Sequence, residues 1–254
     1  MKVTILGCGT SGGVPRIGNQ WGDCDPTNPK NRRRRVSILV AQGDTQILVD
    51  TTPDMREQCL DANITRLDGV LYTHDHADHC HGIDELRPLS YLNRKPIDVY
   101  GSAETLDGLS HRFKYAFVPL GDYYRPIVHA NPINGPFRVG ELNITPFSQV
   151  HGAKESLGFR IGSLAYSTDL VELPEESFEI LAGVDTWIVD ALQRTPHPTH
   201  THLEKTLGWI ERVKPKRAIL THMALDMDYD TLVAELPAGV EPGYDGLEFE
   251  LPDA

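Results

Sequence analysis

The densest group of metal-binding residue types lies between residues 73 and 79, where the chain reads Thr-His-Asp-His-Ala-Asp-His directly after an apolar run. Histidine and carboxylate side chains are the natural ligands of zinc and related ions. Alternate residues of an extended segment point the same way, so His74 and His76 can bind one ion. Asp78 and His79 follow on the turn toward the next helix and can reach a second ion. A solvated histidine-rich loop is the ordinary alternative, but this spacing after a buried strand favours a two-metal hydrolase site.

One segment cannot complete two metal sites, so the remaining ligands must come from other strand ends. Three further residues each end an apolar, strand-like run: His151 in Gln-Val-His-Gly, Asp169 in Ser-Thr-Asp-Leu and His222 in Leu-Thr-His-Met. Each of them alone could be a hydrogen-bonded core or loop residue. Their shared position makes a role as metal ligands the stronger interpretation.

The rest of the sequence predicts strands that deliver these residues and helices that follow them. Apolar runs and turn residues predict strands at 2–6, 36–41, 46–50, 67–72, 97–100, 137–150, 158–167, 186–190, 217–221 and 248–251. Helices are predicted at 53–62, 82–92, 102–113, 175–181, 203–213 and 229–236. The region 116–136, which is rich in proline, is expected to be mostly loop. This pattern is typical of two similar sheet layers covered by helices.

The bulk composition limits the class of protein. The chain has 254 residues, 40% of them hydrophobic and 24% charged, which suits a single globular domain over 1–254. No apolar run approaches the ~20 residues of a membrane span. The first apolar stretch is too short for a signal peptide, and the four cysteines form no Cys-x-x-Cys pair, so a reducing, cytoplasmic location is expected. The net charge of −12 argues against nucleic acid as a partner.

With these ligands in place, the sequence resembles the metallo-β-lactamase superfamily, whose signature is His-x-His-x-Asp-His followed by separate His, Asp and His residues. The resemblance implies an α/β fold, a four-layer α/β/β/α sandwich with the site at one edge of the two sheets. It also implies two divalent metal ions, with zinc as the first choice and manganese compatible with the carboxylates. A water activated between the ions would be the nucleophile. The implied ligands are His74, His76 and His151 for one ion, Asp78, His79 and His222 for the other, and Asp169 as the bridge.

The glycine-rich turn at 7–15 and the segments 219–222 and 244–248 look like a narrower group. They are similar to the phosphoribosyl 1,2-cyclic phosphate phosphodiesterases, which open a cyclic phosphate on ribose and are related to ribonuclease Z. That group places a histidine 22 positions before the last metal-binding histidine, which is His200 here. The resemblance implies that His200 contacts the substrate phosphate or protonates the leaving oxygen as a general acid. His202 is the rival, and both could instead cap the following helix.

Further residues are candidates for contact with the substrate or with its protons. Asp78 could take part in proton transfer, although its role as a ligand already explains it. Arg87, on the helix after the histidine motif, could bind an anionic substrate or could be a solvated residue paired with acids. The same two alternatives hold for the run from Arg32 to Arg35.

The sequence departs from this narrower group in the loop after Trp21 and Gly22. Members of the group often carry Cys-x-Cys-x-x-Cys there, with a histidine soon after the last metal ligand, as a separate structural zinc site. In this chain the matching positions are Asp23, Asp25, Asn28 and Leu225. We therefore expect the structural zinc to be absent, which also weakens the transfer of the exact cyclic substrate.

The sequence as a whole favours a small-molecule phosphodiesterase that acts on a cyclic or nucleotide-like phosphate ester. A transfer-RNA 3′-processing endonuclease is the second hypothesis, but the acidic charge and the lack of a long basic, glycine-rich insertion count against it. The third hypothesis is a non-catalytic binding protein on the same fold, and the complete ligand set counts against it. The family resemblance also favours a homodimer.

Overall fold

A computed structural model describes residues 1–119, 121 and 124–253 of the chain. Their strands form two seven-stranded sheets. The first sheet has the order β14-β1-β2-β3-β4-β5-β6 and contains β1 (Lys2–Gly7), β2 (Ser37–Gln42), β3 (Thr45–Val49), β4 (Gly69–Leu71), β5 (Ile97–Gly101), β6 (Val128–Pro132) and β14 (Glu248–Glu250). The second has the order β13-β12-β11-β10-β9-β8-β7 and contains β7 (Phe137–Val139), β8 (Leu142–His151), β9 (Lys154–Ile161), β10 (Leu164–Ser167), β11 (Thr186–Asp190), β12 (Arg217–Thr221) and β13 (Val240–Pro242).

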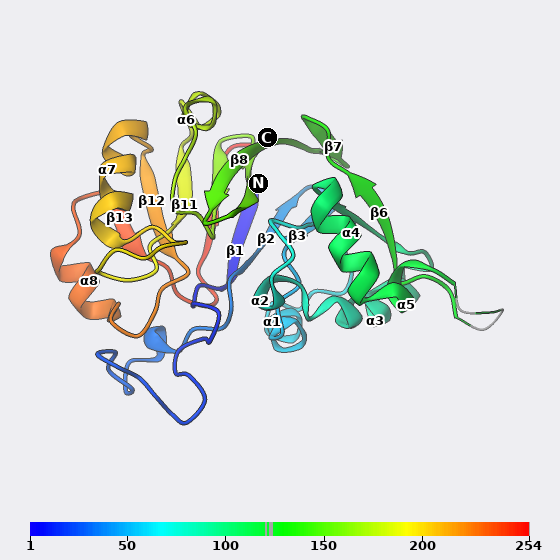
Figure 1. The fold of residues 1–254 in the computed structure, drawn as a ribbon, viewed down its shortest axis with the longest axis horizontal. Helices are drawn as coiled ribbons and strands as arrows, with labels where there is room; N and C mark the ends of the chain where they lie inside the picture. The colour runs from blue at the N-terminus through cyan, green and yellow to red at the C-terminus, as the bar shows by residue number, and fades with distance from the viewer. Residues whose placement is uncertain (120, 122–123, 254) are drawn as a thin grey trace.

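Helices cover the outer face of each sheet, so the fold has four layers (Figure 1). The first sheet is covered by α1 (Met55–Asp61), α3 (Leu86–Asn93), α4 (Ala103–Arg112) and α5 (Lys114–Phe117). The second is covered by α6 (Glu175–Leu181), α7 (Leu203–Val213) and α8 (Tyr229–Glu235). The predicted α/β/β/α sandwich is therefore confirmed. None of the helices in the described part of the chain combines the length and the apolarity needed to cross a membrane.

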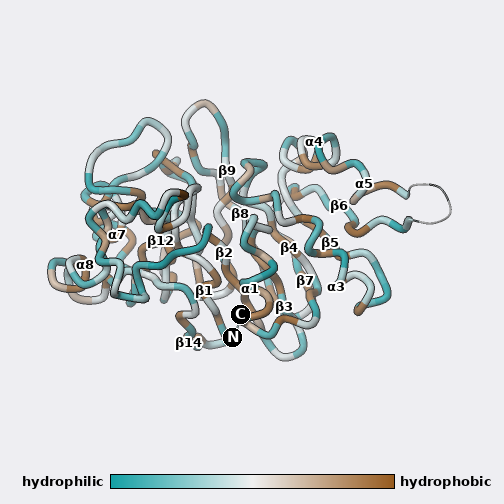
Figure 2. The backbone as a smooth tube through the Cα atoms, turned by 90° about the horizontal axis from the view of Figure 1, so that it is seen from below, coloured by the Kyte–Doolittle hydropathy of each residue, from teal (hydrophilic) through white to brown (hydrophobic). Residues whose placement is uncertain are grey.

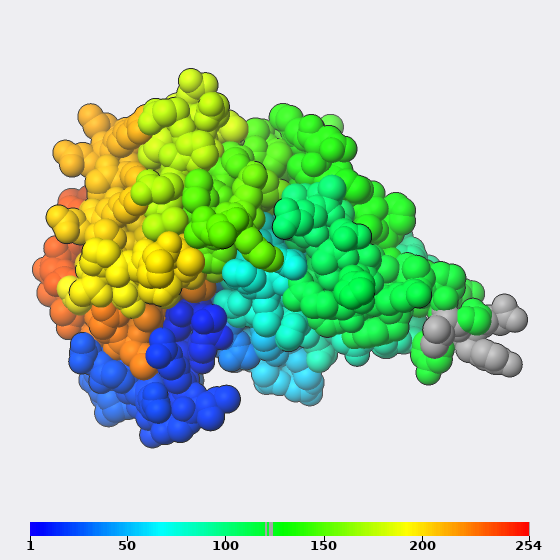
Figure 3. All heavy atoms as spheres, viewed as in Figure 1, coloured from blue at the N-terminus to red at the C-terminus, as the bar shows by residue number. Residues whose placement is uncertain are grey.

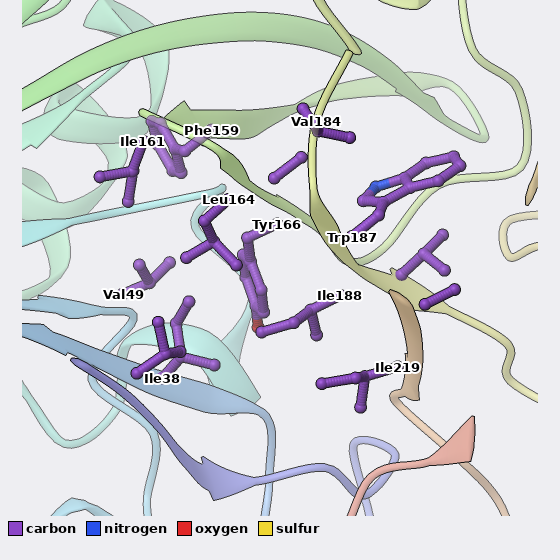
Figure 4. Close-up of a cluster of buried hydrophobic side chains, with 14 of the residues drawn as sticks. Ile38, Val49, Phe159, Ile161, Leu164, Tyr166, Val184, Trp187, Ile188 and Ile219 are labelled. Carbon is purple, nitrogen blue, oxygen red and sulfur yellow. The ribbon is translucent and has the colours of Figure 1, made fainter. Parts of the chain in front are cut away.

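The main hydrophobic core lies between the two sheets. Ile38 and Val49 of the first sheet pack in the same buried cluster as Tyr166, Ile188 and Ile219 of the second (Figure 4). Each fully buried aliphatic side chain contributes roughly 1.5–3 kcal/mol of transfer free energy. Hydrophobic residues follow the interior strands, whereas the long loops are mainly hydrophilic (Figure 2). The packed strands therefore form a rigid base for the polar residues at their ends.

Strand β11 shows how the sequence pattern follows from this packing. All five of its residues are buried. It lies between β10 and β12 and is parallel to both. Parallel strands covered on both faces read as continuous apolar runs rather than as an alternation, because neither face meets water.

The fold confirms one prediction about secondary structure and corrects another. The region 116–136 is mostly loop, as predicted, because its described residues include only the end of α5 and the strand β6 as regular structure. Strand β6 lies at the edge of the first sheet and exposes most of its residues, so it carries no apolar run that could have revealed it. The predicted helix at 82–92 is divided into a short 3-10 turn at Ile83–Glu85 and the helix α3, which ends where Arg94 adopts a left-handed conformation.

Candidate metal centre

All seven predicted ligands meet at one edge of the sandwich, just beyond the ends of strands. The segment with His74 and His76 follows β4 and leads into the short helix α2 (Ala77–Cys80). His151 is the last residue of β8, and His222 directly follows β12. Asp169 lies two residues beyond the end of β10. Because β10 and β12 both run parallel to β11, their C-terminal ends lie at the same edge of the sheet.

The ligands form two groups that share one residue. The first ligand group is His74, His76, His151 and Asp169, and the second ligand group is Asp78, His79, Asp169 and His222. In each group, one nitrogen or oxygen atom of every member lies within 4.8 Å of the corresponding atoms of the others. This spacing suits one ion per group. That these residues bind metal stays a prediction.

Asp169 divides its two carboxylate oxygens between the groups. Its Oδ2 lies 3.7 Å from His74 Nε2 and 3.6 Å from His151 Nε2. Its Oδ1 lies 3.1 Å from His79 Nε2 and 3.3 Å from His222 Nε2. The residue has a left-handed backbone, with a φ angle of 55°. This conformation is energetically unfavourable for a residue other than glycine, so contacts with the surrounding structure must stabilise the backbone of Asp169 there.

The chemistry of the buried imidazoles fits bound metal. The Nε2 atoms of His74, His79 and His222 are all buried and have no hydrogen-bond partner. An unsatisfied buried polar atom costs about 1–3 kcal/mol of stability. Three such nitrogen atoms point toward the shared carboxylate of Asp169, so leaving them without bound metal ions would be costly. Imidazole nitrogens and carboxylate oxygens together are a donor set for zinc or manganese.

The charges around the centre are arranged for cations. Burial and the charge of His79 lower the pKa of His74 well below its ordinary value. Burial by itself lowers the pKa of His222, but the carboxylates of Asp169 and Asp78 raise it to about 9. Burial raises the pKa of Asp78, but His79 and His222 together hold that pKa well below its ordinary value. Metal ligands must be deprotonated, so ions bound here would displace protons from the imidazoles.

Asp50 contacts the ligand His79 on the side of the ring away from the centre. The sequence analysis did not identify Asp50. Its Oδ2 lies 2.7 Å from His79 Nδ1 and accepts a hydrogen bond of 2.8 Å from the Thr73 hydroxyl. Its Oδ1 accepts the Thr73 backbone N–H at 2.9 Å. Such a contact fixes the imidazole ring and leaves Nε2 free for an ion. The available signal was its position, because Asp50 directly follows β3 just as the ligands follow their strands.

His200 lies beside the centre rather than on a helix cap. Its Nδ1 lies 3.0 Å from Asp190 Oδ2, and its ring stacks on that of His222 with centroids 4.7 Å apart. The other candidate, His202, is the N-cap residue of α7, and its side chain makes no capping hydrogen bond. Asp190 also accepts the backbone N–H of Asp169 at 3.0 Å, so one carboxylate orients both neighbours.

An open cleft of about 520 Å³ exposes the centre to solvent. In Figure 3 the dark-blue N-terminal loop and the cyan, green and yellow segments converge near the middle of one face. The cleft is lined by Ser11, His76, Ala77, Asp78, His151, Ala153, Lys154, Asp169, Thr199 and His200. Ser11 and Lys154 were not singled out by the sequence analysis.

The predicted arginines do not line this cleft. Arg87 forms an ion pair with Asp84 at 2.8 Å and lies near the ring of Tyr115. Its contact with substrate stays a prediction without support from its position. In the run from Arg32 to Arg35, the last two residues form ion pairs with acids, Arg32 lies over the Trp21 ring, and Arg33 is buried.

The altered loop at 23–28 is attached to the segment that follows His222. The Asp23 backbone N–H donates to the Leu225 carbonyl oxygen at 2.9 Å. Buried Arg33 reaches the sulfur of Cys24 at 3.8 Å and donates to the Met227 carbonyl oxygen at 2.7 Å. Hydrogen bonds thus join the two segments at the positions discussed for a structural zinc, whose absence stays a prediction.

Comparison with known proteins places the chain in a family. A crystal structure of a diphosphatase from the PhnP family has 37% sequence identity and a TM-score of 0.92, over 98% of this chain and 96% of that one. An octanoyltransferase of Porphyromonas gingivalis is 32% identical over 253 residues, 98% of this chain and 51% of that protein. A ribonuclease Z of Bradyrhizobium is 32% identical over 145 residues, 54% of this chain and 47% of that protein.

The chain spans about half the length of these curated relatives. Residues 45–223 match the family model described as the β-lactamase superfamily domain. This range contains all seven predicted ligands and both residues that orient their neighbours, Asp50 and Asp190. The chain therefore belongs to the metallo-β-lactamase superfamily and has a metal-dependent hydrolase fold.

Proposed function

We propose that this hydrolase is a two-metal phosphodiesterase that acts on cyclic or nucleotide-like phosphate esters. The observation that carries the proposal is the position of Asp169, which turns one carboxylate oxygen to each ligand group while His200 lies alongside. When bound, the two ions would supply an activated water and would stabilise negative charge on the phosphate. Zinc fits the histidines of the first ligand group, and manganese is the alternative at the more acidic second ligand group.

His200 is the residue of this chain that we assign to proton transfer. Asp190 accepts from Nδ1, which leaves Nε2 turned toward the cleft and 3.7 Å from Asp169 Oδ2. A protonated imidazole held in this way can donate its Nε2 proton to a leaving oxygen. Asp78 remains ionised because its pKa is lowered by the neighbouring histidines, so its role is that of a ligand.

One feature supports a phosphate ester as the substrate, and a second favours a small one. Two of the similar proteins are named a diphosphatase and a ribonuclease, and both names denote cleavage at phosphorus. The net charge of −12 disfavours a long polyanion such as transfer RNA, whose grip requires many lysines and arginines. Tight, salt-sensitive retention of transfer RNA in a filter-binding assay would favour the ribonuclease alternative instead.

The variant His200→Ala tests the assignment, with His202→Ala as the matched control. The substrates are bis(p-nitrophenyl) phosphate, which has a good leaving group, and a dinucleotide, whose alkoxide leaving group needs a proton. General acid catalysis typically contributes about 10²- to 10⁴-fold. We expect His200→Ala to lose kcat in that range on the dinucleotide, to lose much less on the nitrophenyl ester, and to retain both ions. His202→Ala should match the wild type.

Other results would redirect the proposal. His200 also belongs to a third group with Asp169, Asp190 and His222 that is close enough to hold an ion. Loss of one ion from His200→Ala would therefore assign His200 to metal binding. Equal losses on both substrates would also rule out the acid role. A last result concerns the wild type with both ions bound and the His74→Ala variant. If both proteins were inactive on a broad panel of phosphodiesters, the hypothesis of a non-catalytic binding protein would replace that of an enzyme.

We also propose that residues 1–254 act as one hydrolase domain. Strands β1 and β14, from the two ends of the chain, pair side by side in the first sheet. Their contact joins both ends to the sheet that carries part of the centre. The homodimer and the cytoplasmic location stay predictions, which sedimentation and cell fractionation would test.

A further inference from the structure

A second pocket, of about 400 Å³, lies at the edge of the first sheet opposite to the metal centre. Arg94 and Lys95, which connect α3 to β5, line this pocket together with Arg125, which lies shortly before β6. Strand β5 runs parallel to β4 and β6 runs parallel to β5. The C-terminal end of β4 leads to His74, so the N-terminal ends of β5 and β6 lie at the far edge of the sheet. The pocket is therefore separate from the cleft of the metal centre.

The three cations of this pocket come from two segments of the chain. The segment with Arg94 and Lys95 is joined to the segment with Arg125 by a hydrogen bond of 2.9 Å from the Ile97 N–H to the Ile127 carbonyl oxygen. Among the described residues, none forms an ion pair with these three side chains, and no aspartate or glutamate lines the pocket. All three side chains are exposed. The chain as a whole has a net charge of −12, so this group is opposite in sign to the rest of the protein.

The dipole of α3 accounts for two of these cations but not for the third. Arg94 is the C-cap residue of α3, so Arg94 and Lys95 lie where a helix favours positive charge. Arg125 comes from a different segment, and its charge adds to the repulsion among three neighbouring cations. A bound anion would relieve this repulsion and accept charge-assisted hydrogen bonds. Phosphate suits two arginines in particular, because a guanidinium group can bind it through two parallel hydrogen bonds.

Tyr91 adds an aromatic surface beside the cations. The residue lines the same pocket and is 65% exposed. Pro96 and Pro126 also line the pocket, so apolar surface lies next to the charges. Aromatic side chains stack on nucleobases, with a gain that depends little on which base is present. Cations for phosphate and a ring for a base together match a nucleotide.

We propose that Tyr91, Arg94, Lys95 and Arg125 form a distal nucleotide site, in which the cations bind the phosphates and Tyr91 stacks on the base. Among the described residues, none of the metal-ligand candidates lines this pocket, so a nucleotide bound there would be held without being cleaved. The distal nucleotide site goes beyond the proposed phosphodiesterase function and does not depend on it.

Calorimetry with the metal-loaded protein tests the role of the cations. The probe is α,β-methylene-ADP, in which the methylene group between the phosphorus atoms resists hydrolysis. The variants are Arg94→Gln and Arg125→Gln, and the matched control is Lys214→Gln. Lys214 is likewise a C-cap residue with a left-handed backbone, but it ends α7 on the other sheet. Each arginine variant should weaken distal binding at least about tenfold, and the control should bind as the wild type does. Unchanged binding in both arginine variants would overturn the proposal.

The variant Tyr91→Ala separates recognition of the base from recognition of the phosphates. The second probe is methylenediphosphonate, which has the same bridged phosphorus atoms but lacks adenosine. Tyr91→Ala should weaken distal binding of α,β-methylene-ADP about five- to 150-fold and leave that of methylenediphosphonate within about twofold of the wild type. No loss for either probe, or an equal loss for both, would overturn the assignment to a nucleotide.

The metal centre could bind the same probes, so two further measurements distinguish the sites. In His74→Ala, distal binding of α,β-methylene-ADP should remain within about twofold of the wild type. Loss of all nucleotide binding in His74→Ala would place that binding in the cleft and overturn the distal nucleotide site. Arg125→Gln should cleave bis(p-nitrophenyl) phosphate at the wild-type rate. If the wild type cleaves no phosphodiester but binds nucleotide through Arg125, the proposed activity fails and the distal nucleotide site stands.

Discussion

Replacing Asp50 with asparagine should weaken metal binding at the second ligand group while leaving the fold in place. The Asp50 side chain is fully buried, and its backbone has a left-handed φ angle of 63°. Asparagine has nearly the same shape and tolerates this backbone better than most residues. The change therefore acts mainly on hydrogen bonds rather than on packing.

The effect follows from the contact between Asp50 and His79, 2.7 Å from Oδ2 to Nδ1. The carboxylate can only accept there, so Nδ1 carries the proton and Nε2 keeps the lone pair that an ion needs. An amide nitrogen in place of Oδ2 would donate to Nδ1 and move the proton to Nε2. If the amide turned over instead, its nitrogen would face the Thr73 N–H and leave that buried donor unsatisfied, at about 1–3 kcal/mol.

The expected magnitude comes from comparable contacts behind metal ligands, whose loss typically costs about 10- to 100-fold in metal affinity. Asp50→Asn should therefore bind the ion of the first ligand group as the wild type does. It should bind the ion of the second ligand group about 10- to 100-fold more weakly. Chelator competition with readout by elemental analysis measures both affinities. Thermal unfolding of the metal-free proteins reports separately on the fold.

The matched control is Asp98→Asn. Asp98 Oδ1 also lies 3.0 Å from the Nδ1 of a histidine, His129, but this pair joins β5 and β6 at the exposed edge of the first sheet. The control should bind both ions as the wild type does. Two ions bound by Asp50→Asn with unchanged affinity would refute the role that we assign to the Asp50 contact.

Four further substitutions test the stability of the fold. Burial raises the pKa of Asp245 from 3.8 to about 7, so the folded state binds the carboxyl proton more tightly than the unfolded state does. Protonation of Asp245 should therefore stabilise the fold fully below about pH 4, and this stabilisation should be lost as the pH rises through about 7. In denaturant titrations, the unfolding free energy should fall over this range by no more than about 4 kcal/mol relative to Asp245→Asn. Gly82→Ala would place a Cβ 2.0 Å from the Thr52 carbonyl oxygen, so unfolding titrations should show a loss of about 1–3 kcal/mol. Gly208→Ala, in open space on α7, should instead gain about 0.5–1 kcal/mol. Trp187→Ala, at a fully buried position, should cost about 3–5 kcal/mol, and a loss below about 1 kcal/mol would contradict the packing described for β11.

Much of the fold could be predicted because its strands are buried on both faces. The run 187–189 in the middle of β11 is apolar throughout, and such runs remain visible in a single sequence. Strand β6 could not be found in this way, since an edge strand with exposed residues resembles a loop. The break before α3 was also hidden, because a 3-10 turn and the first turn of an α-helix have similar residue preferences.

The sequence by itself determined the ligand types and their positions at strand ends, because these depend on local spacing and on apolar runs. Only the tertiary structure decided which residues of different strands meet. Asp50 lies beside His79, which is 29 positions away in the chain, and Lys154 lies opposite His151 in a hairpin. No local pattern distinguishes Asp50 from an ordinary charge at a strand end, or Lys154 from an ordinary surface charge. The packing of the sheets brings each of these two residues beside a predicted ligand. The metal-binding chemistry was thus visible in the sequence, whereas the residues that orient the ligands emerged from the packing.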